Sequence, residues 1–276
     1  MGGQPVHDSL QFEGRRVVVT GAASGMGGAC ATILGQLGAE VHGLDIKPGT
    51  APVADFHLCD LGDRGQIDET VAAIGEPVDS LFNCAGLPTT APGQEIVLVN
   101  FTGHRHLTES LVPSMPQGSS IGFISSVAGM GWVPNAAHLL ELVATPDFAS
   151  AKAWCEEHDD LVSPNGYGFS KEAINAYVAK RGFELAPKGI RLNSINPGPT
   201  DTPMMPAFVE TVGAEFLEKI PRPVGRNSRA DEQAWALIML NSARSSYTTA
   251  TTLFTDGGFT GGLLTGSIDF SALMPD

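Results

Sequence analysis

The chain has 276 residues, of which 42% are hydrophobic and 17% are charged. This size and composition suit one α/β domain with a real hydrophobic core, or at most two small domains. The 30 acidic residues outnumber the 16 basic ones and give a net charge of -14, which argues against a nucleic-acid or anionic-membrane surface because phosphate binding needs clustered Lys and Arg.

Strand-like and helix-like segments alternate along most of the chain. Short β-branched or apolar runs predict strands buried on both faces, and apolar residues at helical spacing predict the helices between them. In chain order we expect strands at 15–20, 40–45, 56–58, 78–83, 120–125, 190–195 and 252–254, and helices at 25–37, 67–74, 95–111, 167–185 and 230–240. This order predicts a single Rossmann-type domain over residues 1–276, with a doubly wound parallel sheet of about seven strands and helices on both faces.

Two stretches interrupt the alternation. Residues 132–164 hold two helix-like segments, at 138–143 and 148–158, and Thr145-Pro146 resembles an N-cap followed by proline at the first helical position. Residues 199–226 are rich in Pro, Met and Phe. Both stretches follow strand ends on the side where open α/β sheets bind ligands, so we interpret them as a helical insertion and a substrate loop.

The cysteines and the apolar segments give no sign of a metal centre or of export. The four cysteines, at positions 30, 59, 84 and 155, form no C-x-x-C pair, and no histidine cluster completes a metal set. We expect Cys30, Cys59 and Cys84 to be small buried thiols in a reducing compartment. Residues 1–12 lack the apolar region of a signal peptide, and no apolar run is long enough to span a membrane, so we expect a cytoplasmic protein.

A glycine-rich loop lies between the first strand and the first helix. Its glycines, Gly21, Gly25 and Gly27, follow the spacing G-x-x-x-G-x-G, with Ser24 and Met26 between them. Glycine allows a tight turn and a close backbone approach to a pyrophosphate, and the helix N-terminus supplies N–H donors and a favourable dipole. A glycine triplet alone is weak evidence of a binding site, but its place between a strand and a helix predicts a site for a dinucleotide.

Asp45 ends the second strand. An acid at this place hydrogen-bonds the adenosine ribose hydroxyls and repels a 2′-phosphate, which favours NAD over NADP. Lys47 is the only base nearby, and the glycine loop carries none. The competing interpretation of Asp45 is a solvated acid at a strand end.

Tyr167 and Lys171 stand four positions apart in a predicted helix. They share one helix face, where an ammonium could stabilise the phenolate and lower the tyrosine pKa toward that of a useful base. The Tyr-x-x-x-Lys pattern alone is common and equally describes an ordinary surface pair.

Together with other motifs, this pair resembles the short-chain dehydrogenase/reductase family, over about residues 15–258. The motifs occur in the family's order: Thr20-Gly21-x-x-x-Gly25-x-Gly27, Asp60-Leu61, Asn83-Cys84-Ala85-Gly86, Val99-Asn100, Ile124-Ser125-Ser126, Tyr167-x-x-x-Lys171, Asn196-Pro197-Gly198 and Asp256-Gly257-Gly258. The gap before Tyr167 looks most like the branch of bacterial 3α-hydroxysteroid dehydrogenase/carbonyl reductases and coniferyl-alcohol dehydrogenases.

The resemblance implies a catalytic set of four residues. Tyr167 would be the general acid/base, and Lys171 would bind the nicotinamide ribose and lower the tyrosine pKa. Ser126, rather than the preceding Ser125, would hydrogen-bond the substrate oxygen. Asn100 would kink its helix and hold a water that links Lys171 to solvent; without the family it reads as a helix-surface residue.

The resemblance also implies the cofactor contacts. Asp60 and Leu61 would flank the adenine, and Asn83, Ala85 and Gly86 would line the adenine ribose and the central sheet. Pro197, Gly198 and either Thr200 or Thr202 would contact the nicotinamide. The implied activity is NAD-dependent interconversion of an alcohol and a ketone or aldehyde.

The sequence departs from the family pattern at two places. Cys84 stands where the family usually has a second Asn. Ser126 and Tyr167 are 41 positions apart, much further than the family's usual spacing, and the extra segment is either a lid or substrate wall, or a surface that faces another subunit. The family's usual assembly implies a homo-tetramer or homo-dimer.

Apolar residues crowd the two unusual stretches, among them Trp132, Met204, Met205 and Phe208. They predict a pocket for a small apolar alcohol or ketone, such as a steroid, terpenoid or aryl compound, although helix packing also explains Phe208. Two rival functions stay open: a non-catalytic NAD-binding regulator, and an epimerase or dehydratase of the same superfamily.

Overall fold

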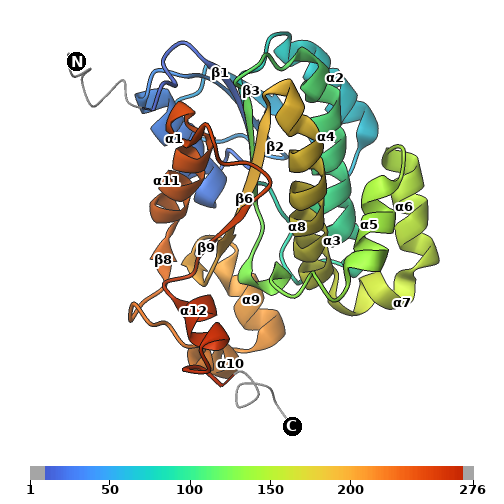
Figure 1. Cartoon of the computed structure of the whole chain (residues 1–276), viewed down its shortest axis with the longest axis vertical. Coiled ribbons are helices and arrows are strands. Elements are labelled where there is room, and N and C mark those ends of the chain that lie inside the picture. Colours follow the sequence, from blue (N-terminus) through green and yellow to red (C-terminus); the bar gives the residue numbers. More distant parts are fainter. Residues whose placement is uncertain (1–9, 270–276) are drawn as a thin grey trace.

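The structure is a computed structural model and describes residues 10–269 (Figure 1). Among these residues, seven parallel strands form one sheet in the order β3-β2-β1-β4-β5-β6-β9. The strands are β1 (Arg16–Thr20), β2 (Glu40–Asp45), β3 (Asp55–Leu58), β4 (Ser80–Asn83), β5 (Ser120–Ile124), β6 (Arg191–Pro197) and β9 (Thr252–Thr255). The predicted doubly wound sheet is confirmed, with strand ends that differ from the predicted ones by only a few residues.

Helices cover both faces of the sheet. On one face lie α1 (Gly25–Gln36) and α11 (Ala230–Asn241), and on the other lie α2 (Arg64–Ile74), α4 (His104–Leu111) and α8 (Gly166–Leu185) (Figure 1). The strand β1 shows why its three central residues are valines: Val17 and Val19 enter the core beneath α1, whereas Val18 enters the opposite core. Both faces of the strand are therefore out of water.

The predicted helix at 95–111 is divided into three parts. It begins as α3 (Gly93–Val97), passes through a π-helical turn (Leu98–Gly103) and continues as α4. A π turn inserts an extra residue into the helical ladder and bends the helix, and such turns are frequent at functional sites. Asn100, where the sequence predicts a kink, lies within this π turn.

Several short elements were not predicted. They are the two-stranded pair β7 (Thr200–Asp201) and β8 (Ser228–Arg229), and the helices α9 (Met205–Val212), α10 (Ala214–Lys219) and α12 (Phe259–Leu264). All of them follow β6 or β9 in the chain, and α9, α10 and α12 lie in the lower part of Figure 1. The predicted substrate loop is thus a small helical subregion.

The insertion forms α5 (Ala136–Ala144), α6 (Phe148–Glu157) and α7 (Asp159–Val162) on the outer side of α3 and α8 (Figure 1). The prediction of an N-cap at Thr145 is wrong, because Thr145 is the C-cap of α5. The N-cap of α6 is Asp147, whose carboxylate accepts a hydrogen bond from the Ser150 N–H at 2.8 Å. A carboxylate is the stronger acceptor for the free N–H groups of a first helical turn.

A buried arginine fastens this insertion to the core. Arg105 of α4 donates hydrogen bonds to the backbone oxygens of Leu142, Val143, Thr145 and Asp147, at 2.9–3.2 Å. These oxygens belong to the end of α5 and to the turn that follows. A cation there satisfies carbonyls that have no partner within the helix and opposes the negative end of its dipole.

The thiols match their predicted surroundings in part. Cys30, Cys59 and Cys155 are buried, whereas Cys84 is half-buried at the edge of the binding cavities. Within residues 10–269, none of the helices combines the length and the apolar character that a membrane crossing requires. The predictions about the terminal residues 1–9 and 270–276 lie outside the described residues.

Candidate active site

Two adjoining cavities open at the carboxyl ends of the strands. The first has a volume of about 680 Å³ and extends from the glycine loop to Asp45 and Asp60. The second has a volume of about 600 Å³ and contains Ser126, Tyr167 and Lys171. Residues of both the glycine loop and the β4 end line both cavities, so the two form one continuous groove.

Glycine is required in the loop after β1. Gly21 has a φ of +69°, and a Cβ there would lie 2.9 Å from the backbone N and Cα of Ala85. A Cβ on Gly27 would overlap the backbone of Gly21. This tight loop leads into the N-terminus of α1, whose N-cap Ser24 makes no capping hydrogen bond through its side chain. The first N–H groups of α1 therefore face the cavity and suit a pyrophosphate.

A buried hydrogen-bond chain joins this loop to the π turn. The hydroxyl oxygen of Thr20 accepts hydrogen bonds from the N–H groups of Cys84 and Ala85, at 2.8 and 3.0 Å. His104 lies 2.9 Å from the same hydroxyl through Nε2, and its Nδ1 lies 3.1 Å from the Asn100 carbonyl oxygen. Because a carbonyl only accepts, Nδ1 carries the hydrogen and Nε2 accepts from Thr20.

The far end of the first cavity contains the predicted acids. The Asp45 carboxylate accepts hydrogen bonds from the backbone N–H groups of Ala23 and Lys47, at 3.0 and 3.3 Å. Asp60, Leu61 and Lys47 line the same cavity. Asn83 is not among the lining residues; it is buried in the sheet, where its amide donates to Thr108 at 3.3 Å. Among the described residues, this far end of the groove is formed in part by the ends of β2 and β3 and the residues that follow them.

Two ionisable residues of α8, Tyr167 and Lys171, line the second cavity. Lys171 Nζ donates a hydrogen bond to the Ile124 carbonyl oxygen at 2.9 Å and lies 5.5 Å from the centre of the Tyr167 ring. Burial lowers the pKa of Lys171 to about 8. Burial raises the pKa of Tyr167 to about 12, which the hydrogen bond with Ser126 opposes. Burial is thus the dominant influence on the pKa of Tyr167 in this arrangement, and the lowering of this pKa by Lys171 stays a prediction.

Ser126 and Ser125 have different partners. The Ser126 side chain hydrogen-bonds Tyr167 and accepts from the Ala128 N–H at 3.1 Å. The Ser125 hydroxyl donates to the Lys171 carbonyl oxygen at 2.9 Å and so fastens β5 to α8. Only Ser126 is therefore paired with the tyrosine hydroxyl, in keeping with the choice made from the sequence.

Asn100 holds the loop after β4 in place. Its amide oxygen accepts from the Leu87 N–H at 2.7 Å, and its amide nitrogen donates to the Leu87 carbonyl at 3.3 Å and to the Ser170 hydroxyl at 3.4 Å. Asn100 is 1% exposed, so its sequence-only interpretation as a helix-surface residue is wrong. Its role in holding a water beside Lys171 stays a prediction.

A contact between two glycines sets the position of Tyr167. The helix α8 begins at Gly166, and a Cβ on this residue would lie 2.8 Å from the carbonyl carbon of Gly93 and would overlap its Cα. The backbones of α3 and α8 therefore touch directly beside the tyrosine. The sequence alone gave no sign of this contact, because two isolated glycines so far apart carry no pattern.

The substrate side of the groove is largely apolar. Met204, Met205 and Phe208 line it as predicted, and the ring of Phe208 meets that of Tyr167 edge-on with 5.0 Å between centres. Pro197, Gly198, Thr200 and Thr202 border the same cavity. The Thr200 hydroxyl is engaged with Ser228 and the Gly198 carbonyl, whereas Thr202 borders both cavities.

The insertion does not form a cavity wall. Trp132 packs against the core, and no residue of 132–164 is among those that line the second cavity, although the flanking Gly131 and Asn165 are. The interpretation of these helices as a lid or substrate wall is therefore not supported. The other interpretation, a surface that faces another subunit, stays a prediction.

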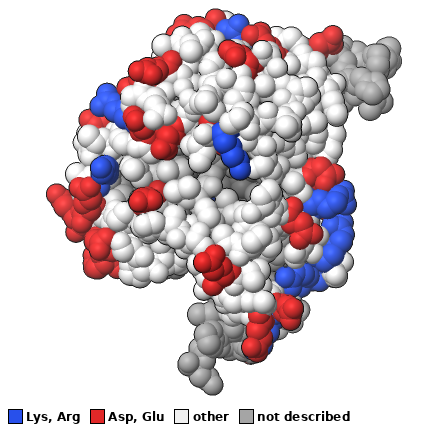
Figure 2. Space-filling view, turned by 180° about the vertical axis from the view of Figure 1, so that it is seen from behind, with Lys and Arg blue, Asp and Glu red and all other residues white. Residues whose placement is uncertain are grey.

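Charges are spread over the surface of the molecule. On the face in Figure 2, Asp and Glu are scattered, and Lys and Arg lie beside them. Ion pairs such as Arg226–Glu232 and Arg229–Asp231 illustrate this pairing.

Two protein-family models match the chain. The model described as short chain dehydrogenase matches residues 15–138, and the model described as enoyl-(acyl carrier protein) reductase matches residues 157–260. The unmatched stretch between them lies within the insertion. The matched regions contain the glycine loop in the first case and the Tyr167–Lys171 pair in the second.

Individual proteins are similar over nearly the whole chain. A coniferyl-alcohol dehydrogenase of Pseudomonas sp. strain HR199 is 31% identical, with 90% of this chain and 98% of that protein covered. A 3-alpha-hydroxysteroid dehydrogenase/carbonyl reductase of Comamonas testosteroni is 30% identical, with 88% and 95% covered. The crystal structure of the 3-alpha-hydroxysteroid dehydrogenase from Pseudomonas sp. B-0831, complexed with NADH, superposes with a TM-score of 0.77 at 28% identity, with 92% of this chain and 100% of that chain covered.

Proposed function

Because the chain belongs to the short-chain dehydrogenase/reductase family and is an oxidoreductase of alcohols and carbonyl compounds, we propose that it uses NAD and acts on an apolar substrate. The substrate would be a secondary or aryl alcohol, or the matching ketone or aldehyde. The observation that carries the proposal is the meeting of Tyr167, Ser126 and Lys171 in the second cavity, which adjoins the cavity of the glycine loop. The rest of the groove supplies the cofactor and substrate surfaces.

The residues of the first cavity fit a dinucleotide. The open N-terminus of α1 and the close backbone approach at Gly21 suit the pyrophosphate. The Asp45 carboxylate, at the end of β2, suits the adenosine ribose hydroxyls. Bound NAD would supply the hydride acceptor, and the protein would supply position and charge.

The proton path uses the chain's own residues. In alcohol oxidation, Ser126 and Tyr167 would hydrogen-bond the substrate oxygen, and the tyrosine Oη would take the hydroxyl proton. A tyrosine with a pKa of about 12 is almost wholly protonated at neutral pH, so formation of the phenolate that accepts this proton needs a nearby cation. The Lys171 ammonium, 5.5 Å from the ring centre, would provide it.

The first test removes the tyrosine hydroxyl. Purified protein and the Tyr167→Phe variant are assayed with NAD and a panel of secondary and aryl alcohols, by the absorbance of NADH. We expect turnover by the parent protein and a loss of about 100- to 10,000-fold in kcat for the variant, the usual contribution of general acid–base catalysis. Turnover that is equal in both proteins would contradict the proposed role.

The second test concerns cofactor choice. We expect a higher kcat/KM with NAD than with NADP, because Asp45 repels the 2′-phosphate. The Asp45→Ser variant should reduce this preference, and Lys47→Ser should not reduce it. A parent protein that prefers NADP would show instead that Lys47, which lines the same cavity, dominates the choice.

The substrate class follows from the apolar lining of the second cavity. A volume of about 600 Å³ suits a compound of one or several rings. We expect kcat/KM to rise from small polar alcohols to aryl and polycyclic alcohols. The names of the two similar dehydrogenases, for coniferyl alcohol and hydroxysteroids, support this range.

A non-catalytic regulator is the second candidate. The four residues Asn100, Ser126, Tyr167 and Lys171 are all present and placed around one cavity, which favours catalysis. NAD binding without turnover on any member of the alcohol and carbonyl panels would favour the regulator. NAD retained through purification would instead favour an epimerase or dehydratase.

A further inference from the structure

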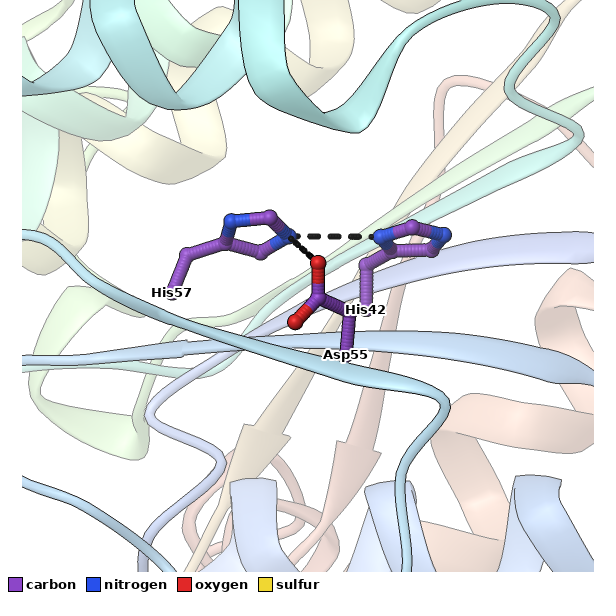
Figure 3. Close-up of side chains that lie close together, drawn as sticks. All are labelled: His42, Asp55 and His57. Atoms are coloured by element: carbon purple, nitrogen blue, oxygen red, sulfur yellow. Dashed lines mark hydrogen bonds and ion pairs between the residues drawn. The ribbon is translucent and has the colours of Figure 1, made fainter.

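A separate group of metal-binding residue types lies on strands β2 and β3. His42 belongs to β2, and Asp55 and His57 belong to β3, which is the edge strand of the sheet. The parallel register places Asp55 beside His42 and His57 beside Leu44. Since alternate residues of a strand share a face, the three side chains leave the same face of the sheet (Figure 3).

Their donor atoms converge. His42 Nδ1 lies 3.3 Å from His57 Nε2, and His57 Nε2 lies 3.5 Å from Asp55 Oδ2. One donor atom from each residue lies within 4.8 Å of the other two. A tetrahedral zinc ion, with bonds of about 2.0–2.1 Å, holds neighbouring ligand atoms about 3.3–3.4 Å apart. The observed separations are therefore close to those that such an ion requires.

Glu40 orients the buried ligand. Its carboxylate lies 3.2 Å from His42 Nε2, and because a carboxylate accepts, Nε2 carries the hydrogen. In a neutral ring this leaves the lone pair on Nδ1, the atom that faces His57. A histidine held by a carboxylate through its other nitrogen is the usual arrangement around a metal. His42 is 7% exposed, and its ring stacks on His57 with an angle of 11° between planes.

We propose that His42, Asp55 and His57 bind one divalent transition-metal ion of the zinc class. The ligand atoms are His42 Nδ1, Asp55 Oδ2 and His57 Nε2, and water completes the coordination. Two imidazoles with one carboxylate suit zinc better than magnesium or calcium, which prefer oxygen ligands. For binding, His57 moves its ring hydrogen to Nδ1, so that Nε2 offers a lone pair to the ion.

This proposal departs from the sequence expectation of no metal centre. The two histidines are far apart in the chain, and only the pairing of β2 with β3 brings them together. The ion would add a link through side chains to the backbone hydrogen bonds that already join the edge strand β3 to β2. Its effect would be on the stability of this edge, since the group lies outside the residues that line the catalytic cavity.

The experiment uses the full chain, without an affinity tag and after treatment with a chelator. Zinc chloride is titrated in against a chromophoric chelator, and cobalt chloride is added separately to record the visible absorption of a tetrahedral site. We expect one ion per chain, a tetrahedral cobalt spectrum, and a Tm that rises with zinc concentration. Absence of zinc binding by the parent protein would overturn the proposal.

Variants identify the ligands. Asp55→Asn is the substitution expected to disturb the fold least, because the Asp55 carboxylate is exposed. His57→Gln removes the ring nitrogen that would bind the ion. Both should weaken zinc binding by more than tenfold, and Glu40→Gln should weaken it by about 10- to 100-fold, as loss of an outer partner does. The control His106→Gln removes a histidine that pairs with only one carboxylate, Asp68, and should leave binding unchanged.

The outcome is decided by comparison of these variants. Binding that is lost in His57→Gln and Asp55→Asn but kept in His106→Gln supports the site. Binding that is unchanged in Asp55→Asn and His57→Gln, or lost equally in the control, overturns it. Should His57→Gln fail to fold by circular dichroism, Asp55→Asn decides alone.

Discussion

Replacing Gly166 with alanine tests whether direct backbone contact between α3 and α8 sets the position of Tyr167, the proposed catalytic residue. Alanine favours a helix by about 1 kcal/mol over glycine, so helix propensity alone predicts a more stable protein. The new Cβ, however, would lie 2.8 Å from the Gly93 carbonyl carbon and would overlap its Cα.

The size of the effect follows from this overlap. Carbon atoms in contact need about 3.5–4.0 Å, so the two helices must separate by about 1 Å. Tyr167 is the next residue and moves with the start of α8. A displacement of about 1 Å can lower a rate by about 100-fold, so we expect that loss in kcat with the affinity for NADH little changed.

The assay compares this variant with Gly261→Ala. Gly261 also lies in a helix, α12, but a Cβ there meets no atom within 4 Å. Turnover is measured by NADH absorbance with the best alcohol of the panel, cofactor affinity by NADH fluorescence, and stability by urea unfolding. A Gly166→Ala enzyme within about threefold of the parent kcat, against the 100-fold expected, would refute the reasoning.

Two further predictions concern stability. Arg105→Met should lower the free energy of unfolding by about 2–4 kcal/mol, because several buried carbonyl oxygens lose a charged donor. The control Arg64→Met removes an exposed ion pair with Asp68 and should change the free energy of unfolding by less than about 1 kcal/mol. Equal changes in the two variants, measured by urea unfolding, would contradict the proposed role of Arg105 in fastening the insertion to the core. Burial lowers the pKa of His104 to about 4, below its unfolded value of about 6.5, so the unfolded chain binds the extra proton between these two values. Stability should therefore fall as the pH drops from about 6.5 to about 4, with a contribution on the order of 3 kcal/mol from this group. Urea unfolding at several pH values in that range should show that the free energy of unfolding depends less steeply on pH in His104→Gln than in the parent protein. An equal pH dependence in the two proteins would contradict the assignment of this effect to His104.

The main sheet and the placement of Tyr167 and Lys171 on one helix were predictable because their signals are local. Buried strands such as β1 read as apolar β-branched runs, and the helices between them carry apolar residues at helical spacing. The glycine loop stands out because its residues are adjacent in the chain. Elements of two residues, such as β7, carry no such pattern.

The contacts that were missed depend on distant residues. His104 meets Thr20, and Arg105 meets the end of α5, only after the sheet and helices have packed. Trp132 was predicted to line the substrate pocket on its apolar character, but core packing satisfies that character equally well. Asp147 rather than Thr145 is the N-cap of α6, because Thr145 ends α5 and Asp147 has the extended backbone and the capping hydrogen bond.

The walls of the substrate cavity and its reacting groups come from different parts of the fold. Tyr167 and Ser126 belong to α8 and the end of β5, which are fixed by buried contacts, whereas Met205 and Phe208 belong to α9, a short helix with no buried residue. Substitutions in α9 can therefore alter the shape of the cavity while the reacting groups keep their positions. The fold thus offers a route by which selection, natural or in the laboratory, can change which alcohol is accepted without rebuilding the chemistry.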